Sequence, residues 1–120
     1  MELNILHLYP DSMSLYGEWA NLAILCRHLE ALDVAVTVEK VTGEDTPDFT
    51  RADMIYMGAG TEGAQKAALL GLVRHAGELK AAVDRGALLL FTGSAMEVLG
   101  ASVTDAAGKV WQGLALADFT

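Results

Sequence analysis

The stretch Gly86-Ala-Leu-Leu-Leu-Phe-Thr-Gly-Ser-Ala-Met-Glu-Val-Leu-Gly100 decides the fold of this chain. Its apolar run, Ala87–Phe91, is short and continuous, which is typical of a central strand covered on both faces. Small residues then predict a tight turn over 92–95, and apolar residues return at helical spacing over 96–99. Many α/β hydrolytic enzymes hold a nucleophile on a strand-turn-helix of this kind. The centre of this turn is Gly93, which has no side chain that could attack a substrate.

Strands and helices alternate before this stretch. Further strands are predicted where short apolar or β-branched runs occur, at Leu3–Leu8, Val34–Val41 and Ala52–Met57. Helices are predicted over about 16–32 and over 62–85, with Gly71 and Gly77 as weak points or breaks in the second. This alternation indicates right-handed crossovers and a mostly parallel sheet with helices on both faces.

The segments outside this alternation are predicted to be a loop and a hairpin. The polar run Thr42–Thr50 is expected to be a loop, and Ser102–Trp111 a hairpin that turns at Asp105–Gly108. The sequence therefore predicts one domain over residues 1–120, a three-layer α/β domain of flavodoxin-like type. Because it stops on a hairpin and lacks a closing helix, we expect this domain to be unusually small or incomplete.

Composition excludes several classes of function. The chain has 120 residues, of which 52% are apolar, and a formal net charge of −8. Such a charge argues against non-specific nucleic-acid binding, since no basic stripe is present to displace phosphate counterions. The longest apolar runs are too short to cross a membrane. The single cysteine, Cys26, permits no internal disulfide, and the start lacks a signal peptide, so a cytoplasmic location is expected.

Ligands of open α/β sheets bind at the carboxyl ends of the strands, and three such ends carry suggestive residues. They are Tyr9-Pro10-Asp11, Gly58-Ala59-Gly60 and Thr92-Gly93-Ser94. The glycines of the second allow backbone N–H groups to approach an oxyanion or carboxylate, although a tight strand-helix turn without a ligand would have the same residues. This turn has neither the dinucleotide-binding nor the phosphate-loop pattern.

The side chains that could carry out chemistry have simpler structural interpretations. Cys26 falls on the apolar face of a helix, where we expect it to pack in the core. No spacing pairs one histidine with another metal ligand, so we expect His7, His28 and His75 to be structural and predict no metal site. Ser94 is predicted to be a helix N-cap, and Glu97 to be a solvated carboxylate in the first turn of that helix.

Three segments, taken in order, share the pattern of a known family. They are Leu15-Tyr-Gly-Glu18 with Asn21-Leu22, Ala52-Asp-Met-Ile-Tyr-Met-Gly-Ala-Gly60, and Gly108-Lys-Val-Trp-Gln-Gly-Leu-Ala-Leu-Ala-Asp-Phe119. With these segments the chain resembles the class I glutamine amidotransferase domains of the cobyric acid synthase type. The likeness is greatest to the subunits that work with a Mur-ligase-like partner on a cell-wall precursor. Gln65 also lies where this family often has Gln.

The resemblance implies a site without its nucleophile. Matching Leu99-Gly100 to the end of the family's elbow puts the catalytic cysteine on Gly93 and the next glycine on Ser94. Gly58 and Gly60 match the loop that binds the oxyanion, with Ala59 in place of its middle glycine. The family's catalytic histidine lies in a later half that this chain lacks. The resemblance therefore implies no catalytic residue, no cofactor, and a ligand site made of Gly58, Ala59, Gly60, Gly93 and Ser94.

Three functions remain open at this point. In the first, the chain is a non-catalytic amidotransferase-like subunit that binds a glutamine-like ligand or a partner, namely a Mur-ligase-like or other ATP-dependent ligase. Alternatively, it is a truncated amidotransferase that supplies ammonia from glutamine for cobyric acid or cell-wall precursor amidation. A third possibility is a structural module that forms a homo-oligomer to cover an open sheet edge.

Overall fold

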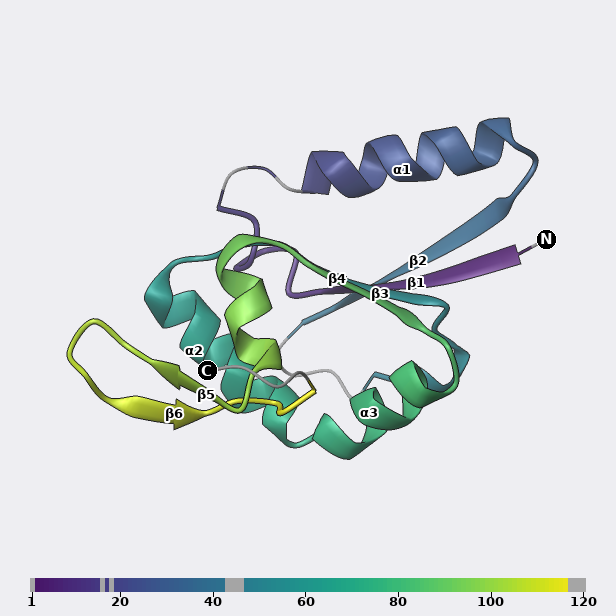
Figure 1. Ribbon diagram of the computed structural model, residues 1–120. Coiled ribbons are helices and arrows are strands. Elements are labelled where there is room, and N and C mark those ends of the chain that lie inside the picture. The colour runs from purple at the N-terminus through teal and green to yellow at the C-terminus, as the bar shows by residue number, and fades with distance from the viewer. Residues whose placement is uncertain (1, 16, 18, 43–46, 117–120) are drawn as a thin grey trace.

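In the computed structural model, the described residues are 2–15, 17, 19–42 and 47–116, and they contain a four-stranded parallel sheet in the order β2-β1-β3-β4. Its strands are β1 (Glu2–Leu8), β2 (Ala35–Val41), β3 (Met54–Met57) and β4 (Leu88–Phe91). The helices are α1 (Trp19–Ala31), α2 (Glu62–Val73) and α3 (Ala76–Asp84). Figure 1 shows α1 on one face of the sheet and α2 with α3 on the other, which confirms the three-layer α/β prediction.

The sheet separates two apolar cores because successive side chains of a strand point to opposite faces. On the α1 face, Ile5, Met54 and Tyr56 pack with Leu22 of α1. The larger core, on the other face, includes Leu6, Leu8, Ile55, Met57, Leu69, Leu72 and Leu79. All four residues of β3 are buried, as a continuous apolar run in a central strand predicts.

The predicted helix over 62–85 divides at a different place from the one expected. It ends and restarts at Arg74 and His75, where the His75 N–H donates to the Leu72 carbonyl at 2.8 Å, so His75 lies between two helices. Gly71 is inside α2, and a Cβ there would come within 2.5 Å of Tyr9 Oη. Gly77 is inside α3. The prediction of breaks at the glycines is wrong, because Gly71 makes room for Tyr9.

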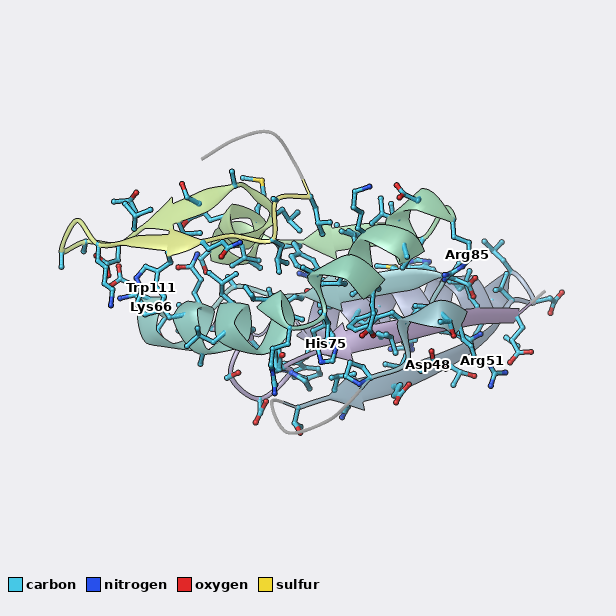
Figure 2. The ribbon with its side chains drawn as sticks, turned by 90° about the horizontal axis from the view of Figure 1, so that it is seen from below. Asp48, Arg51, Lys66, His75, Arg85 and Trp111 are labelled. Atoms are coloured by element: carbon cyan, nitrogen blue, oxygen red, sulfur yellow. The ribbon has the colours of Figure 1, made fainter. Side chains whose placement is uncertain are left out.

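A short 3-10 helix, η1 (Phe49–Arg51), begins at the end of the segment that was predicted to be a loop, of which residues 43–46 lie outside the described residues. Arg85, at the end of α3, holds it in place because its guanidinium Nη2 donates to the carbonyls of Phe49 at 3.2 Å and Ala52 at 2.8 Å. Figure 2 shows Arg85 beside this segment.

The segment after β4 is a second 3-10 helix, η2 (Gly93–Leu99), which begins at the centre of the predicted turn. The predicted hairpin follows, with β5 (Ser102–Thr104) antiparallel to β6 (Val110–Gln112). Asp105, in its turn, accepts hydrogen bonds from Lys66 Nζ of α2 at 2.8 Å and from Trp111 Nε1 at 3.2 Å (Figure 2). The hairpin is therefore fastened to α2. None of the helices in the described ranges is long and apolar enough to cross a membrane.

Candidate functional site

The turns after β1, β3 and β4 meet at the carboxyl edge of the sheet. The Leu15 N–H, from the segment after β1, donates to the Ala59 carbonyl at 2.9 Å. A Cβ on Gly60 would collide with Met13 Sδ and lie 3.1 Å from the Ser12 carbonyl oxygen, so a side chain there would force its neighbours to shift. The sequence predicted candidate ligand-binding residues at these three ends. After β1 the contacts with the turn after β3 are made by Met13 and Leu15, and not by the predicted residues Tyr9-Pro10-Asp11.

Ser94 joins the turn after β4 to the turn after β3. Its hydroxyl accepts from the Gly60 N–H at 3.1 Å and donates to the Gly60 carbonyl at 2.9 Å. Thr92, rather than Ser94, occupies the N-cap position of η2, and its side chain makes no capping hydrogen bond. The N-cap prediction for Ser94 is therefore wrong, because the hydroxyl reaches a neighbouring turn instead of its own helix.

Gly93 and Ala59 are in close contact across the same two turns. Gly93 is exposed and has a φ of +58°, a left-handed conformation that L side chains rarely adopt. A Cβ built on Gly93 would lie 2.8 Å from the Cβ of Ala59, which is only 5% exposed. The Ala59 methyl group therefore occupies the space that a side chain at Gly93 would need.

Gln65 of α2 is hydrogen-bonded to η2. This side chain is only 5% exposed, and its Nε2 donates to the Ser94 carbonyl at 2.7 Å and to Glu97 Oε2 at 3.1 Å. Glu97 is exposed, as the sequence predicted for a solvated carboxylate, but it also accepts this hydrogen bond and lies beyond the first turn of η2. Together these contacts hold the segment Gly93–Glu97 against the turn after β3 and against α2.

The groups of the site that could stabilise a charged ligand are backbone groups, and those of Gly60 are already hydrogen-bonded within the protein. Gly58, Ala59 and Gly60 are all buried, and the Gly60 N–H is bound to the Ser94 hydroxyl. This N–H is one of those that the sequence predicted to face an oxyanion. A ligand could use it only by displacing the hydroxyl of Ser94, so the described geometry favours a closed structural clamp over an open oxyanion hole.

Cys26 lies away from these turns, on α1, and packs beside Leu22 and Tyr56. Burial, and next the charge of Glu30, raise the pKa of its thiol, so the thiolate form that reacts is disfavoured. Cys26 is thus half-buried and packs against the core of the α1 face, as its place on the apolar side of the helix predicted.

The three histidines lie in different parts of the fold. His7 is in β1 and His28 in α1, while His75 Nδ1 is 3.3 Å from Glu78 Oε1. Among the described residues, no group of three or more His, Cys, Asp or Glu side chains could hold a metal ion.

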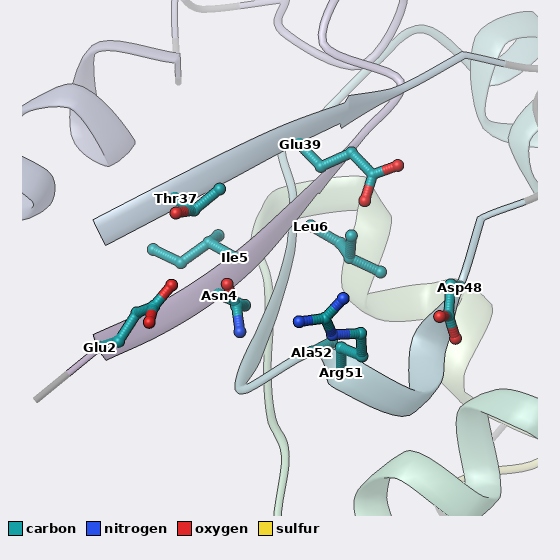
Figure 3. Close-up of a pocket in the computed structure, with 9 residues that line it drawn as sticks. All are labelled: Glu2, Asn4, Ile5, Leu6, Thr37, Glu39, Asp48, Arg51 and Ala52. Atoms are coloured by element: carbon teal, nitrogen blue, oxygen red, sulfur yellow. The ribbon is translucent and has the colours of Figure 1, made fainter. Parts of the chain in front are cut away.

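A cavity of about 350 Å³ lies at the opposite, amino end of the strands. Figure 3 shows the guanidinium of Arg51 and the carboxylates of Glu2 and Glu39 around it. Sequence reasoning missed this cavity because its charged residues come from β1, β2 and η1 and form no motif. Its position separates it from the turns at Gly60 and Gly93.

Comparison with known proteins agrees with the resemblance in part. No family model matches the chain. It is 28% identical over 113 residues to subunit GatD of the glutamine-hydrolyzing lipid II isoglutaminyl synthase of Streptococcus pneumoniae, covering 94% of this chain and 44% of that protein. It is 25% identical over 118 residues to the Staphylococcus aureus protein of the same name, covering 98% and 49%.

This chain is a distant homologue of those two synthase subunits. It spans less than half of their length. A crystal structure described as a peptidase E protein of Listeria monocytogenes EGD-e superimposes with a TM-score of 0.69 at 16% identity, covering 98% of this chain and 64% of that one. That likeness supports the fold alone, which is the flavodoxin-like arrangement shared by peptidase E and class I glutamine amidotransferases.

Proposed function

We propose that this chain is a glutamine amidotransferase-like domain of the cobyric acid synthase type that does not hydrolyse glutamine by itself and acts as a partner-dependent subunit. The observation that carries the proposal is the contact between Ala59 and Gly93. If the family's cysteine corresponds to Gly93, its Cβ would need the space that the Ala59 methyl group fills. The two departures from the family pattern, Ala59 and Gly93, are thus sterically matched.

The neighbouring groups support the same interpretation. An activated serine nucleophile donates its hydroxyl proton to a base, whereas Ser94 donates to the Gly60 carbonyl. The hydroxyl also accepts from the Gly60 N–H, which would otherwise be available to stabilise an oxyanion. A retained ligand-binding role for Gly58, Ala59, Gly60, Gly93 and Ser94 would then depend on the exposed backbone of Gly93, because the three residues of the other turn are buried, and it would involve no covalent step.

The proposed partner is an ATP-dependent ligase chain of the Mur-ligase type. The relatives are named as subunits of a synthase. In this chain, β4 pairs only with β3 among the described strands, and its residues Leu88 and Leu90 are 61% and 41% exposed. By register with Met54 and Tyr56, both face the α1 side of the sheet. An apolar strand at a sheet edge tends to pair with another chain, so we propose that the ligase covers β4.

Glutamate formation from glutamine tests the non-catalytic role. We expect the purified chain, and the complex isolated from its source cells, to show no turnover that depends on this subunit. Removing a catalytic nucleophile can cost on the order of a million-fold in kcat. Hydrolysis by the isolated wild-type chain at an ordinary enzymatic rate, on the order of 10 s⁻¹, would instead support the alternative of a truncated working amidotransferase.

Native mass spectrometry of the endogenous complex tests the partner. The proposal predicts a hetero-oligomer that contains an identified ligase chain and that is lost in the variant Leu90→Glu. The matched control is Leu70→Glu, because Leu70 is similarly exposed, at 58%, but lies on α2. A homo-oligomer disrupted by Leu90→Glu would support the third function, a structural module that covers its own sheet edge.

A further inference from the structure

A second cavity, of about 310 Å³, lies between α1 and the sheet. Four of its lining residues, at 19, 22, 23 and 26, share one face of α1, because they are spaced three or four positions apart. The opposite wall is made by β1 and β2, whose residues His7 and Lys40 are neighbours in register. The remaining lining residues are Pro10 and Val38. None of these eight residues is a carboxylate, although the chain has a formal net charge of −8.

His7, one of the lining residues, has a buried ring nitrogen without a partner. His7 is only 3% exposed, and its Nε2 has no hydrogen-bond partner among the described residues. Buried side-chain nitrogens are normally paired, so this one, on a residue beside a cavity, indicates a missing hydrogen-bond partner. Burial, and next the charge of Lys40, lower the pKa of His7. The imidazole is therefore neutral and can present either a proton or a lone pair at Nε2.

The rest of the cavity is apolar and uncharged apart from Lys40. Leu22 and Val38 are aliphatic, and the raised pKa of Cys26 keeps its thiol neutral. Trp19, which is 60% exposed, places a large aromatic ring at one side. An apolar cavity of about 150 Å³ accommodates benzene, so this one has room for a body of two fused rings.

We propose that this cavity binds a small amphipathic carboxylate with a flat apolar body. The apolar body lies between α1 and β2, and the carboxylate accepts hydrogen bonds from Lys40 Nζ and, when the His7 ring turns toward the cavity, from a proton on its Nε2. Lys40 supplies the only formal charge in the lining, so a ligand with the opposite charge is favoured over a neutral or cationic one. This site is separate from the turns at Gly60 and Gly93 and does not depend on glutamine chemistry.

The test is a calorimetric titration of the whole chain with 2-naphthoate. We expect saturable 1:1 binding, at least ten-fold tighter than for the neutral isostere 2-naphthamide. Lys40→Met should weaken 2-naphthoate binding at least ten-fold and leave 2-naphthamide binding unchanged. Lys80→Met is the matched control, since Lys80 is an exposed lysine of α3, outside the cavity, and should have no effect on either ligand.

A second pair of variants tests the location without altering a buried residue. Ala23 is exposed at the cavity wall, so Ala23→Trp should block binding, while Asn21→Trp, on the same helix but outside the lining, should not. Circular dichroism confirms that each variant is folded. The proposal is overturned if 2-naphthoate shows no saturable binding, if its binding survives Ala23→Trp, or if it binds no better than 2-naphthamide.

Discussion

The turn after β3 is filled and the turn after β4 is open, although both end neighbouring strands of one sheet. Gly58, Ala59 and Gly60 are buried among Met13, Ser94 and the segment that ends at Leu15. Gly93 is exposed, and its positive φ holds the backbone in the conformation of a nucleophile elbow. The difference teaches that an elbow can keep its shape while the neighbouring turn takes the space its side chain would need.

The largest effect is expected from filling the closed turn further. Gly60→Ala would force a Cβ against Met13 Sδ and within 3.2 Å of the Ala64 Cβ. We expect the free energy of unfolding, measured by urea denaturation, to fall by about 3 kcal/mol. The control Gly63→Ala lies in α2 with no atom within 4 Å of the new Cβ, and it should stabilise the protein by about 0.5–1 kcal/mol. Similar effects of both variants would contradict the account.

A smaller loss is expected when the link between the two turns is removed. Ser94→Ala leaves the Gly60 N–H and carbonyl without their common partner, so we expect the free energy of unfolding to fall by about 2 kcal/mol. Thr104→Ala, at an exposed position of the hairpin, should change it by less than about 0.5 kcal/mol. Faster amide hydrogen exchange at Gly60 in the Ser94 variant would locate the loss at this link, whereas unchanged exchange there would contradict it.

The smallest effect is expected at the hairpin that follows η2. The pKa of Asp105 is held well below its usual range by the hydrogen bond from Lys66, and then by those from Trp111 and Lys109. Because the pKa is lower in the folded state, the ionised Asp105 carboxylate stabilises the fold. This stabilisation is complete above the pKa of the unfolded state, about 3.9, and is lost as the pH falls below it. Asp105→Asn should remove the part of the pH dependence of stability that comes from Asp105. The ionisation of Asp105 itself can be followed by the NMR shift of the Trp111 Nε1–H, which is bound to its carboxylate. A shift with the same pH dependence in both proteins would rule out Asp105 as its origin.

Much of the fold could be predicted because its signals are local. The run Ala87–Phe91 and the buried strand before Gly58 are continuous apolar segments, and each lies where the structure has a strand. The prediction that Ala87–Phe91 is a central strand covered on both faces is wrong, because β4 is an edge strand of the described sheet and Leu88 and Leu90 are exposed on one face. The hairpin turn at Asp105–Gly108 was predicted from turn residues, and the Gly108 N–H does donate to the Asp105 carbonyl at 2.9 Å. The packing of the half-buried Cys26 against the core of the α1 face followed from helical spacing alone.

The contacts that define the candidate site could not be predicted because they join segments far apart in the sequence. The role of Ser94 depends on Gly60, and the effect of Gly93 depends on Ala59, each a pair 34 residues apart. Gly71 was misread as a helix break because its cause, the approach of Tyr9 Oη, is tertiary. The free Nε2 of His7 likewise follows from burial and has no sequence signal.

The central claim is that Ala59 occupies the space of a missing side chain at Gly93, and a double-mutant cycle tests it most directly. Urea denaturation would compare the cost of Gly93→Cys in the wild-type chain with its cost in the Ala59→Gly background. Residues in direct contact show coupling free energies of about 0.5–3 kcal/mol, so we predict a cost that is lower by at least about 1 kcal/mol in the Ala59→Gly background. An equal cost in both backgrounds would show that the two positions are independent and would contradict the account.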